Sequence, residues 1–74
     1  MKTFFLLQAD PGFAGAVAEH VANAPGVVSV AVTSGAYDVV AEVEVADDQR
    51  HEELRAIVRL ARGLCRVCVC RVTA

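Results

Sequence analysis

Hydrophobic and polar residues alternate with a period of two on both sides of a glycine near the middle of the chain. The apolar positions are Val28, Val30 and Val32 before the glycine, and Val39, Ala41, Val43 and Val45 after it. Such alternation on two sides of a turn predicts a β-hairpin. Gly35 is the expected pivot, because glycine adopts positive φ angles at no steric cost. Tyr37 and Asp38 are then expected at the start of the outgoing strand, near the hairpin tip.

Two other segments repeat their apolar residues with helical spacing. The first helix is expected to run from Pro11 to about Ala24, with Asp10 as its N-cap. Pro25 cannot continue a helix, so it ends the segment. The expected buried face of this helix consists of Phe13, Val17, Val21 and Ala24.

The second helix is expected at about Gln49–Arg62, after the acidic pair Asp47-Asp48. Acidic residues crowd its start and arginines follow toward its end, an order that complements the helix dipole. Gly63 is the expected C-cap. The apolar face of this helix consists of Leu54, Ile57, Val58 and Ala61.

Four strands complete the prediction, at Thr3–Ala9, Val27–Thr33, Tyr37–Val45 and Arg66–Thr73. The order β-α-β-β-α-β with short connections is that of the ferredoxin-like α+β fold, a four-stranded antiparallel sheet with both helices on one face. A chain of 74 residues is expected to be one domain, residues 1–74.

The second face of this sheet receives no cover from the chain. The third strand offers it Asp38, Val40, Glu42 and Glu44. The first strand offers either Phe4 and Leu6 or Phe5 and Leu7, depending on register. Such a half-apolar face is large for a small domain, and 55% of the residues are hydrophobic. The pattern therefore predicts a sheet-to-sheet partner.

Charge and length exclude several classes of protein. The net charge of −2 does not favour nucleic acid as a partner. No stretch approaches the roughly 20 apolar residues of a membrane span. The apolar run Phe4–Leu7 is too short for a secretory signal, so a cytoplasmic location is expected. Five arginines between Arg55 and Arg71 are expected on a solvated helix face and an oligomer rim, with an anion site as the alternative.

No catalytic constellation stands out, so an enzyme is not expected and no cofactor is predicted. Ser29 and Ser34 have no nearby histidine and no nucleophile-elbow context. His20 and His51 lie on different helices without metal-ligand spacing, and both are expected to face solvent.

Three cysteines, Cys65, Cys68 and Cys70, are crowded into six positions. Alternation directs Cys68 and Cys70 to one side of the last strand, whereas Cys65 is expected in the preceding turn. A zinc site would need a fourth ligand from elsewhere. Small apolar strand residues are the simpler interpretation. We expect three reduced thiols and no stoichiometric metal, with metal binding as the alternative.

The stretch Val32–Val40, VTSGAYDVV, together with Pro25-Gly26-Val27, resembles a known family. It is similar to the effector-binding domain of the Lrp/AsnC transcription regulators, also called the RAM (regulation of amino-acid metabolism) domain. The glycine–any–tyrosine–aspartate step after the second strand is the most recognisable part. The resemblance covers essentially the whole chain and agrees with the predicted element order.

The resemblance implies an assembly and a ligand. Domains of this family form dimers by packing their open sheet faces, and the dimers assemble into rings. Small effectors, typically amino acids, bind in clefts between dimers, which are lined by the loop with the Gly-x-Tyr-Asp step. By this match, Gly35, Tyr37 and Asp38 are candidate ligand-binding residues, with Ser34 and Ala36 as their neighbours.

The chain departs from the family pattern in two ways. Full regulators carry an N-terminal helix-turn-helix domain, whereas this sequence starts at the first strand. It therefore resembles the stand-alone form, expected to bind no DNA directly and to act through a partner such as a full-length regulator. Many members also have threonines in the last strand, where this chain has Val67, Cys68, Val69 and Cys70. The ligand is then expected to differ, to bind weakly or to be absent.

The sequence leaves alternatives open. Asp38 is a candidate partner for the ammonium group of an effector, or it caps the hairpin while Tyr37 packs at an oligomer seam. At the level of function, an amino-acid-sensing module competes with a small dimeric ferredoxin-like enzyme of the monooxygenase or isomerase type. A cysteine-based metal-binding protein is the third class.

Overall fold

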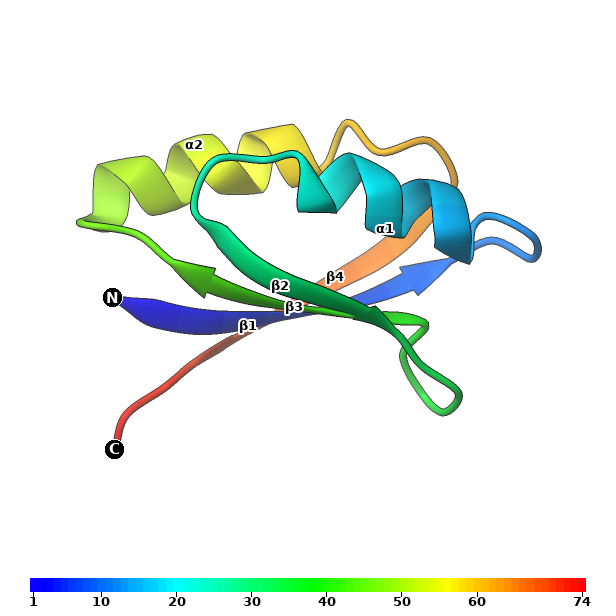
Figure 1. Cartoon of the computed structure of the whole chain (residues 1–74), viewed down its shortest axis with the longest axis horizontal. Helices are drawn as coiled ribbons and strands as arrows, with labels where there is room; N and C mark the ends of the chain where they lie inside the picture. The colour runs from blue at the N-terminus through cyan, green and yellow to red at the C-terminus, as the bar shows by residue number, and fades with distance from the viewer.

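Strands and helices follow one another in the predicted order. The computed structural model describes all 74 residues. The elements are β1 (Lys2–Ala9), α1 (Ala14–Ala22), β2 (Val27–Val32), β3 (Val39–Glu44), α2 (Asp48–Val58) and β4 (Leu64–Arg71). The strands form one antiparallel sheet in the order β2-β3-β1-β4, and both helices cover the same face of it (Figure 1). The ferredoxin-like α+β prediction is confirmed.

The central strand β1 divides its side chains between the two faces of the sheet. Phe5 and Leu7 are fully buried beneath the helices, whereas Phe4 and Leu6 are half-buried on the opposite face. The structure therefore assigns Phe4 and Leu6 to the uncovered face. The core beneath the helices consists of Phe5, Leu7, Val17, Val21, Ala24, Val39, Ala41, Val43, Leu54, Val58 and Ala61.

Helix α1 is shorter than its apolar pattern predicts. It begins at Ala14 with Phe13 at the N-cap position, and no side chain caps it, so the prediction of Asp10 as N-cap is wrong. Gly12 adopts a φ of 86°, and the Phe13 N–H donates to the carbonyl of Asp10. The chain thus makes a turn at Pro11-Gly12 before the helix can start.

Helix α2 begins where its acidic pair predicts but ends early, at Val58 and not at Arg62. The Asp47 carboxylate accepts a 2.9 Å hydrogen bond from the Arg50 N–H, as an N-cap does. Beyond the helix, the N–H of Ala61 donates to the carbonyl of Val58, a tighter three-residue step. Gly63 has a φ of 87° but lies in the turn to β4, so it is not the C-cap, which is Arg59.

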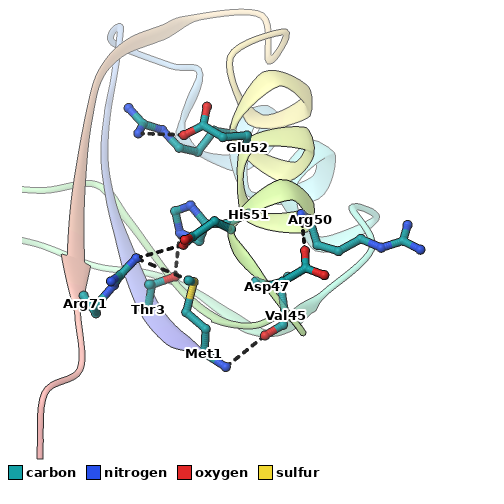
Figure 2. A network of polar contacts seen from close by, with 10 residues as sticks. Met1, Thr3, Val45, Asp47, Arg50, His51, Glu52 and Arg71 are labelled. Atoms are coloured by element: carbon teal, nitrogen blue, oxygen red, sulfur yellow. Dashed lines mark hydrogen bonds and ion pairs between the residues drawn. The ribbon is translucent and has the colours of Figure 1, made fainter.

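A set of polar contacts joins α2 to the start of β1 (Figure 2). His51 Nε2 lies 3.2 Å from Thr3 Oγ1, and both side chains are buried. The His51 ring also lies against Phe5, with ring centroids 5.4 Å apart. The prediction that His51 faces solvent is wrong, because the hydroxyl of Thr3 supplies the hydrogen bond that a buried imidazole needs.

His20 connects the two helices and does not face solvent as predicted. Its Nε2 donates a 2.7 Å hydrogen bond to the carbonyl of Ile57 near the end of α2. The Ile57 carbonyl also accepts a 3.1 Å hydrogen bond from the Leu60 N–H, so the imidazole adds a second donor to a carbonyl in the last turn of the helix. Both histidines are therefore accounted for by packing between elements.

Neither helix is long and apolar enough to cross a membrane.

The sheet face away from the helices is half apolar, as the alternation predicts. Phe4 lies opposite Glu42 on one side and Cys70 on the other, and Leu6 lies between Val40 and Cys68. The Lys2 ammonium lies 3.5 Å from the Glu42 carboxylate. This ion pair offsets the charge of Glu42 on the face. We refer to Phe4, Leu6, Val40, Cys68 and Cys70 as the open face.

Candidate functional site

The hairpin between β2 and β3 carries all five candidate ligand-binding residues, Ser34, Gly35, Ala36, Tyr37 and Asp38. Strand β3 begins at Val39, so Tyr37 and Asp38 belong to the loop and not to the strand as predicted. Gly35 has a φ of 146°, as expected of the pivot. The tip of the hairpin projects away from the helices, on the side of the open face (Figure 1).

Hydrogen bonds close the hairpin loop at its base, whereas the backbone N–H groups at its tip have no partner in the protein. The Thr33 N–H donates to the carbonyl of Asp38 at 2.8 Å, and the Thr33 hydroxyl donates to the carbonyl of Tyr37 at 2.6 Å. No hydrogen bond within the protein uses the N–H of Ser34, Gly35, Ala36 or Tyr37. Four consecutive donors are therefore available to an anionic group, such as a carboxylate.

Asp38 joins the tip to the end of β1. Its N–H donates to the carbonyl of Leu7 at 2.8 Å, and its Oδ2 accepts from the N–H of Ala9 at 2.8 Å. The side chain is half-buried. One carboxylate oxygen thus anchors the loop, and the other oxygen has no partner in the protein.

Gln8 is a further residue at the tip that sequence reasoning missed. Its Nε2 donates a 2.8 Å hydrogen bond to the carbonyl of Ala36. The only signal in the sequence is that Gln8 is a polar residue directly after the apolar run Phe4–Leu7. The pairing of β1 with β3 brings Gln8 beside the loop, and no local sequence pattern predicts this proximity.

Tyr37 reaches the open face beside β4. The neighbouring Cys68 thiol, followed by desolvation, raises the pKa of Tyr37 above that of a free phenol. Arg66 acts in the opposite direction. The phenol therefore stays protonated at neutral pH and is available as a hydrogen-bond donor.

The cysteines are free, and two of them lie where alternation predicts. Cys68 and Cys70 pair in register with Leu6 and Phe4 and lie on the open face. Desolvation, and then the neighbouring Cys68, raise the pKa of the Cys70 thiol. Cys65 belongs to β4 and not to the preceding turn, because β4 already begins at Leu64. No group of three His, Cys, Asp or Glu residues is placed to hold a metal ion. Reduced, metal-free thiols stay a prediction.

A concave surface lies at the opposite end of β2 from the tip. It is a groove of about 270 Å³ between the Pro25-Gly26 turn and the first turns of α2. Val45, Leu54 and Ile57 contribute its apolar lining, and Arg50 and Glu53 are its charged residues on α2. None of the residues from Ser34 to Asp38 lines this groove. Within one copy of the chain, the candidate residues therefore form a ridge and not a cavity.

Comparison with solved structures finds the same fold in several proteins. The protein TTHA0845 from Thermus thermophilus has a TM-score of 0.90 and 24% identity, over 99% of this chain and 94% of that one. The hypothetical protein PHS023 from Pyrococcus horikoshii has a TM-score of 0.83 and 18% identity, over 99% and 90%. At these identities the likeness concerns the fold alone.

A third similar structure is the transcriptional regulator NMB0573 from Neisseria meningitidis, solved as a complex with L-Met. Its TM-score is 0.84 at 14% identity, and the match covers 99% of this chain but 49% of the regulator. No match was found among curated protein sequences.

The family comparison is specific. The Lrp/AsnC ligand binding domain matches residues 2–67, which is nearly the whole chain. Domains of this kind are typically regulatory and not catalytic. The predicted element order, the strand order and the family match agree, and on that match the chain belongs to the Lrp/AsnC ligand-binding domain family.

Proposed function

We propose that this chain is a non-enzymatic, oligomeric module of the cytoplasm that binds an amino acid or a related small metabolite at the hairpin tip. It modulates transcription through a partner, such as a full-length Lrp/AsnC regulator. The observation that supports this most is that hydrogen-bond donors and a carboxylate lie side by side at the tip. Four free N–H groups lie next to Asp38, which has one unpartnered carboxylate oxygen.

An amino acid is complementary to this arrangement. Its carboxylate needs hydrogen-bond donors and its ammonium group needs an anionic acceptor, because desolvating either charge alone is costly. The N–H groups from Ser34 to Tyr37 serve the carboxylate, and Gly35 allows close approach because no side chain covers it. Asp38 accepts from the ammonium group in a charge-assisted hydrogen bond. The Tyr37 ring contacts the side chain of the ligand.

Calorimetry with a panel of the natural amino acids tests binding. Methionine is the first candidate, since the Neisseria meningitidis regulator of the same fold was solved with L-Met. We expect wild-type protein to bind at least one member of the panel with a measurable heat. If no amino acid produces a saturable signal at millimolar concentration, the proposed ligand class is wrong.

The substitution Asp38→Asn separates the two roles of this side chain. Asparagine keeps an oxygen that accepts from the Ala9 N–H, so the loop stays anchored, but it removes the charge that pairs with the ammonium group. We expect affinity to fall about tenfold or more, as losing a charge-assisted bond of about 1.5–3 kcal/mol implies. Melting temperature and oligomeric mass should not change.

Glu52→Gln is the matched control, because it removes the same charge from an exposed position on α2. Its affinity should equal that of the wild type. Equal affinities of Asp38→Asn and Glu52→Gln would show that Asp38 only anchors the hairpin loop and does not bind the ammonium group of the ligand.

The open face supports assembly of the module. Its half-buried Phe4, Leu6 and Val40 expose apolar area on a domain of 74 residues, and a small core gains stability from a second copy packed face to face. A dimer through these faces, extended into a ring of dimers, is the assembly that we propose.

Leu6→Glu tests the face-to-face contact, because a carboxylate at the centre of this face would be buried without a partner. We expect light scattering to give at least a dimer for the wild type and a monomer for Leu6→Glu at micromolar concentration. Leu60→Glu places the same charge at a residue that is 76% exposed beyond the end of α2. It should keep the wild-type mass, and a Leu6→Glu protein that does so too would exclude the contact.

A further inference from the structure

The two edges of the sheet differ in how they are protected against pairing. Strands β2 and β4 are the edges, and each presents one side without a neighbouring strand. Natural sheets commonly place charged residues on such strands to prevent edge-to-edge contact. Strand β4 carries Arg66 and Arg71, whereas no charged residue occurs from Val21 to Tyr37. The β2 edge and its hairpin therefore lack this protection.

The outward hydrogen-bonding groups of β2 can be assigned from its ladder with β3. The Thr33 N–H donates inward to the carbonyl of Asp38, and Ala31 pairs with Val40. In an antiparallel ladder, inward and outward residues alternate. Val30 and Val32 therefore direct their N–H and C=O groups away from the sheet.

A bulge sets the length of this edge. The register of β2 against β3 shifts between Val27 and Ser29. The regular part of the edge is therefore Ser29–Thr33, and its middle residue is Ala31. Val32 is 58% exposed, a large value for a valine on a strand.

We propose that β2 pairs with β2 of a second copy, antiparallel, about a two-fold axis at Ala31. In this register, the N–H and C=O groups of Val30 form hydrogen bonds with those of the partner's Val32. The two-fold axis repeats the same bonds between Val32 and the partner's Val30. Each protomer contributes two N–H and two C=O groups. The proposal rests on the oligomeric part of the proposed function and specifies the contact between dimers.

A second copy is the occupant that this edge fits best. An antiparallel pair about a two-fold axis sets Val30 against Val32, so apolar side chains meet and no charge is desolvated. A free peptide would gain few hydrogen bonds from five residues of edge, and a charged one would find no opposite charge there. A protomer already held in a dimer binds at high effective concentration, so a short contact suffices.

This contact and the open-face contact together define a closed assembly. Each is isologous, with its own two-fold axis, and they use different surfaces of the same protomer. Two such contacts alternate around a ring of dimers and leave no free β2 edge when the ring closes. The unprotected β2 edge is then covered in every copy.

The pairing also completes the candidate ligand site. Because the two β2 strands run in opposite directions, the tip of one hairpin approaches the partner's Pro25-Gly26 turn. That turn lines the groove of about 270 Å³, which no residue of its own hairpin tip reaches. The donors at Ser34–Tyr37 from one copy would then face the partner's apolar groove, which has room for a ligand side chain.

Light scattering on Val32→Lys tests the edge contact. In this register the lysine faces the partner's Val30 and lies diagonal to the partner's lysine, so the two-fold axis brings two like charges close together, while the exposed position leaves the fold intact. We expect the mass to fall from the ring to the dimer. Leu60→Lys adds the same charge at another exposed apolar residue and should keep the ring.

Amide hydrogen exchange tests the same contact without relying on mass. The N–H groups of Val30 and Val32 have no partner in a single copy, so they should exchange within seconds if the edge is free. We expect both to be protected in the wild type and to lose protection in Val32→Lys. The inward N–H of Ala31 should stay protected in both proteins.

Each outcome decides between the two proposals. Fast exchange at Val30 and Val32 in a wild-type ring would overturn the edge pairing while leaving ring assembly in place. A wild-type mass for Val32→Lys would overturn it as well. A wild-type dimer that Leu6→Glu dissociates and Val32→Lys does not would exclude the edge contact and keep the open-face contact. A monomeric wild type would overturn both, whereas amino-acid binding at Asp38 is measured separately.

Discussion

Phe5→Ala is expected to unfold the protein. The Phe5 side chain is 0% exposed, lies at the centre of the core between the sheet and both helices, and contacts the His51 ring. Truncating a buried phenylalanine to alanine costs about 3–5 kcal/mol, since the cavity adds to the lost transfer free energy. A domain of this size has a total stability of only about 3–5 kcal/mol from its core. Far-UV circular dichroism should show loss of cooperative structure at 25 °C.

The neighbouring residue provides the control. Phe4→Ala removes the same atoms from the next position of β1, but Phe4 is half-buried on the open face. We expect this variant to keep its secondary structure and a cooperative thermal transition, with a weaker dimer. Both variants must be compared at one protein concentration, because association contributes to apparent stability. Cooperative folding of Phe5→Ala with a wild-type midpoint would contradict the packing described for β1.

Gly63→Ala is expected to destabilise the protein by about 2–4 kcal/mol, from backbone strain together with overpacking. Gly63 has a φ of 87°, which L side chains rarely adopt. A Cβ at this position would overlap the Phe13 side chain, with atoms of Phe13 at 2.3 to 2.5 Å. Phe13 holds the turn before α1, and the Asp10 N–H donates to the carbonyl of Gly63. The substitution therefore disturbs the place where both helix connections meet. Urea denaturation measures the change.

Gly12→Ala separates the two contributions at Gly63. Gly12 has nearly the same φ, 86°, but a Cβ there would meet no atom within 4 Å. Its substitution should cost only the conformational part, about 1–2 kcal/mol. Equal losses for Gly12→Ala and Gly63→Ala would show that the Phe13 side chain moves aside freely.

The candidate site illustrates what local sequence leaves undetermined. The Gly-x-Tyr-Asp step places the turn and its pivot Gly35 correctly, since the φ of Gly35 and the alternation on both sides depend on neighbours in the chain, but it puts Tyr37 and Asp38 on the strand and not in the loop. The bond from the Ala9 N–H to Asp38 and the contribution of Gln8 depend on pairing with β1, which lies about 30 residues away in the sequence. Whether Tyr37 and Asp38 bind a ligand stays a prediction.

The helix ends show the same division. Acidic residues at Asp47-Asp48 fix the start of α2, because a cap acts within one turn. The apolar pattern extends both helices too far, since the turns at Pro11-Gly12 and Gly63 are shaped by contact between Phe13 and the β4 connection. Helical periodicity also places His20 and His51 in solvent wrongly, because it does not reveal a hydrogen-bond partner on another element.

By itself the sequence determined the element order, the ferredoxin-like fold class and the position of the hairpin, because periodicity and turn residues act over short distances. Only the tertiary structure decided which face of β1 carries Phe5, which polar groups of Asp38 and the two histidines are already satisfied, and that β2 ends the sheet as an uncharged edge. These features depend on strand order and register, which are set when distant segments pack against one another.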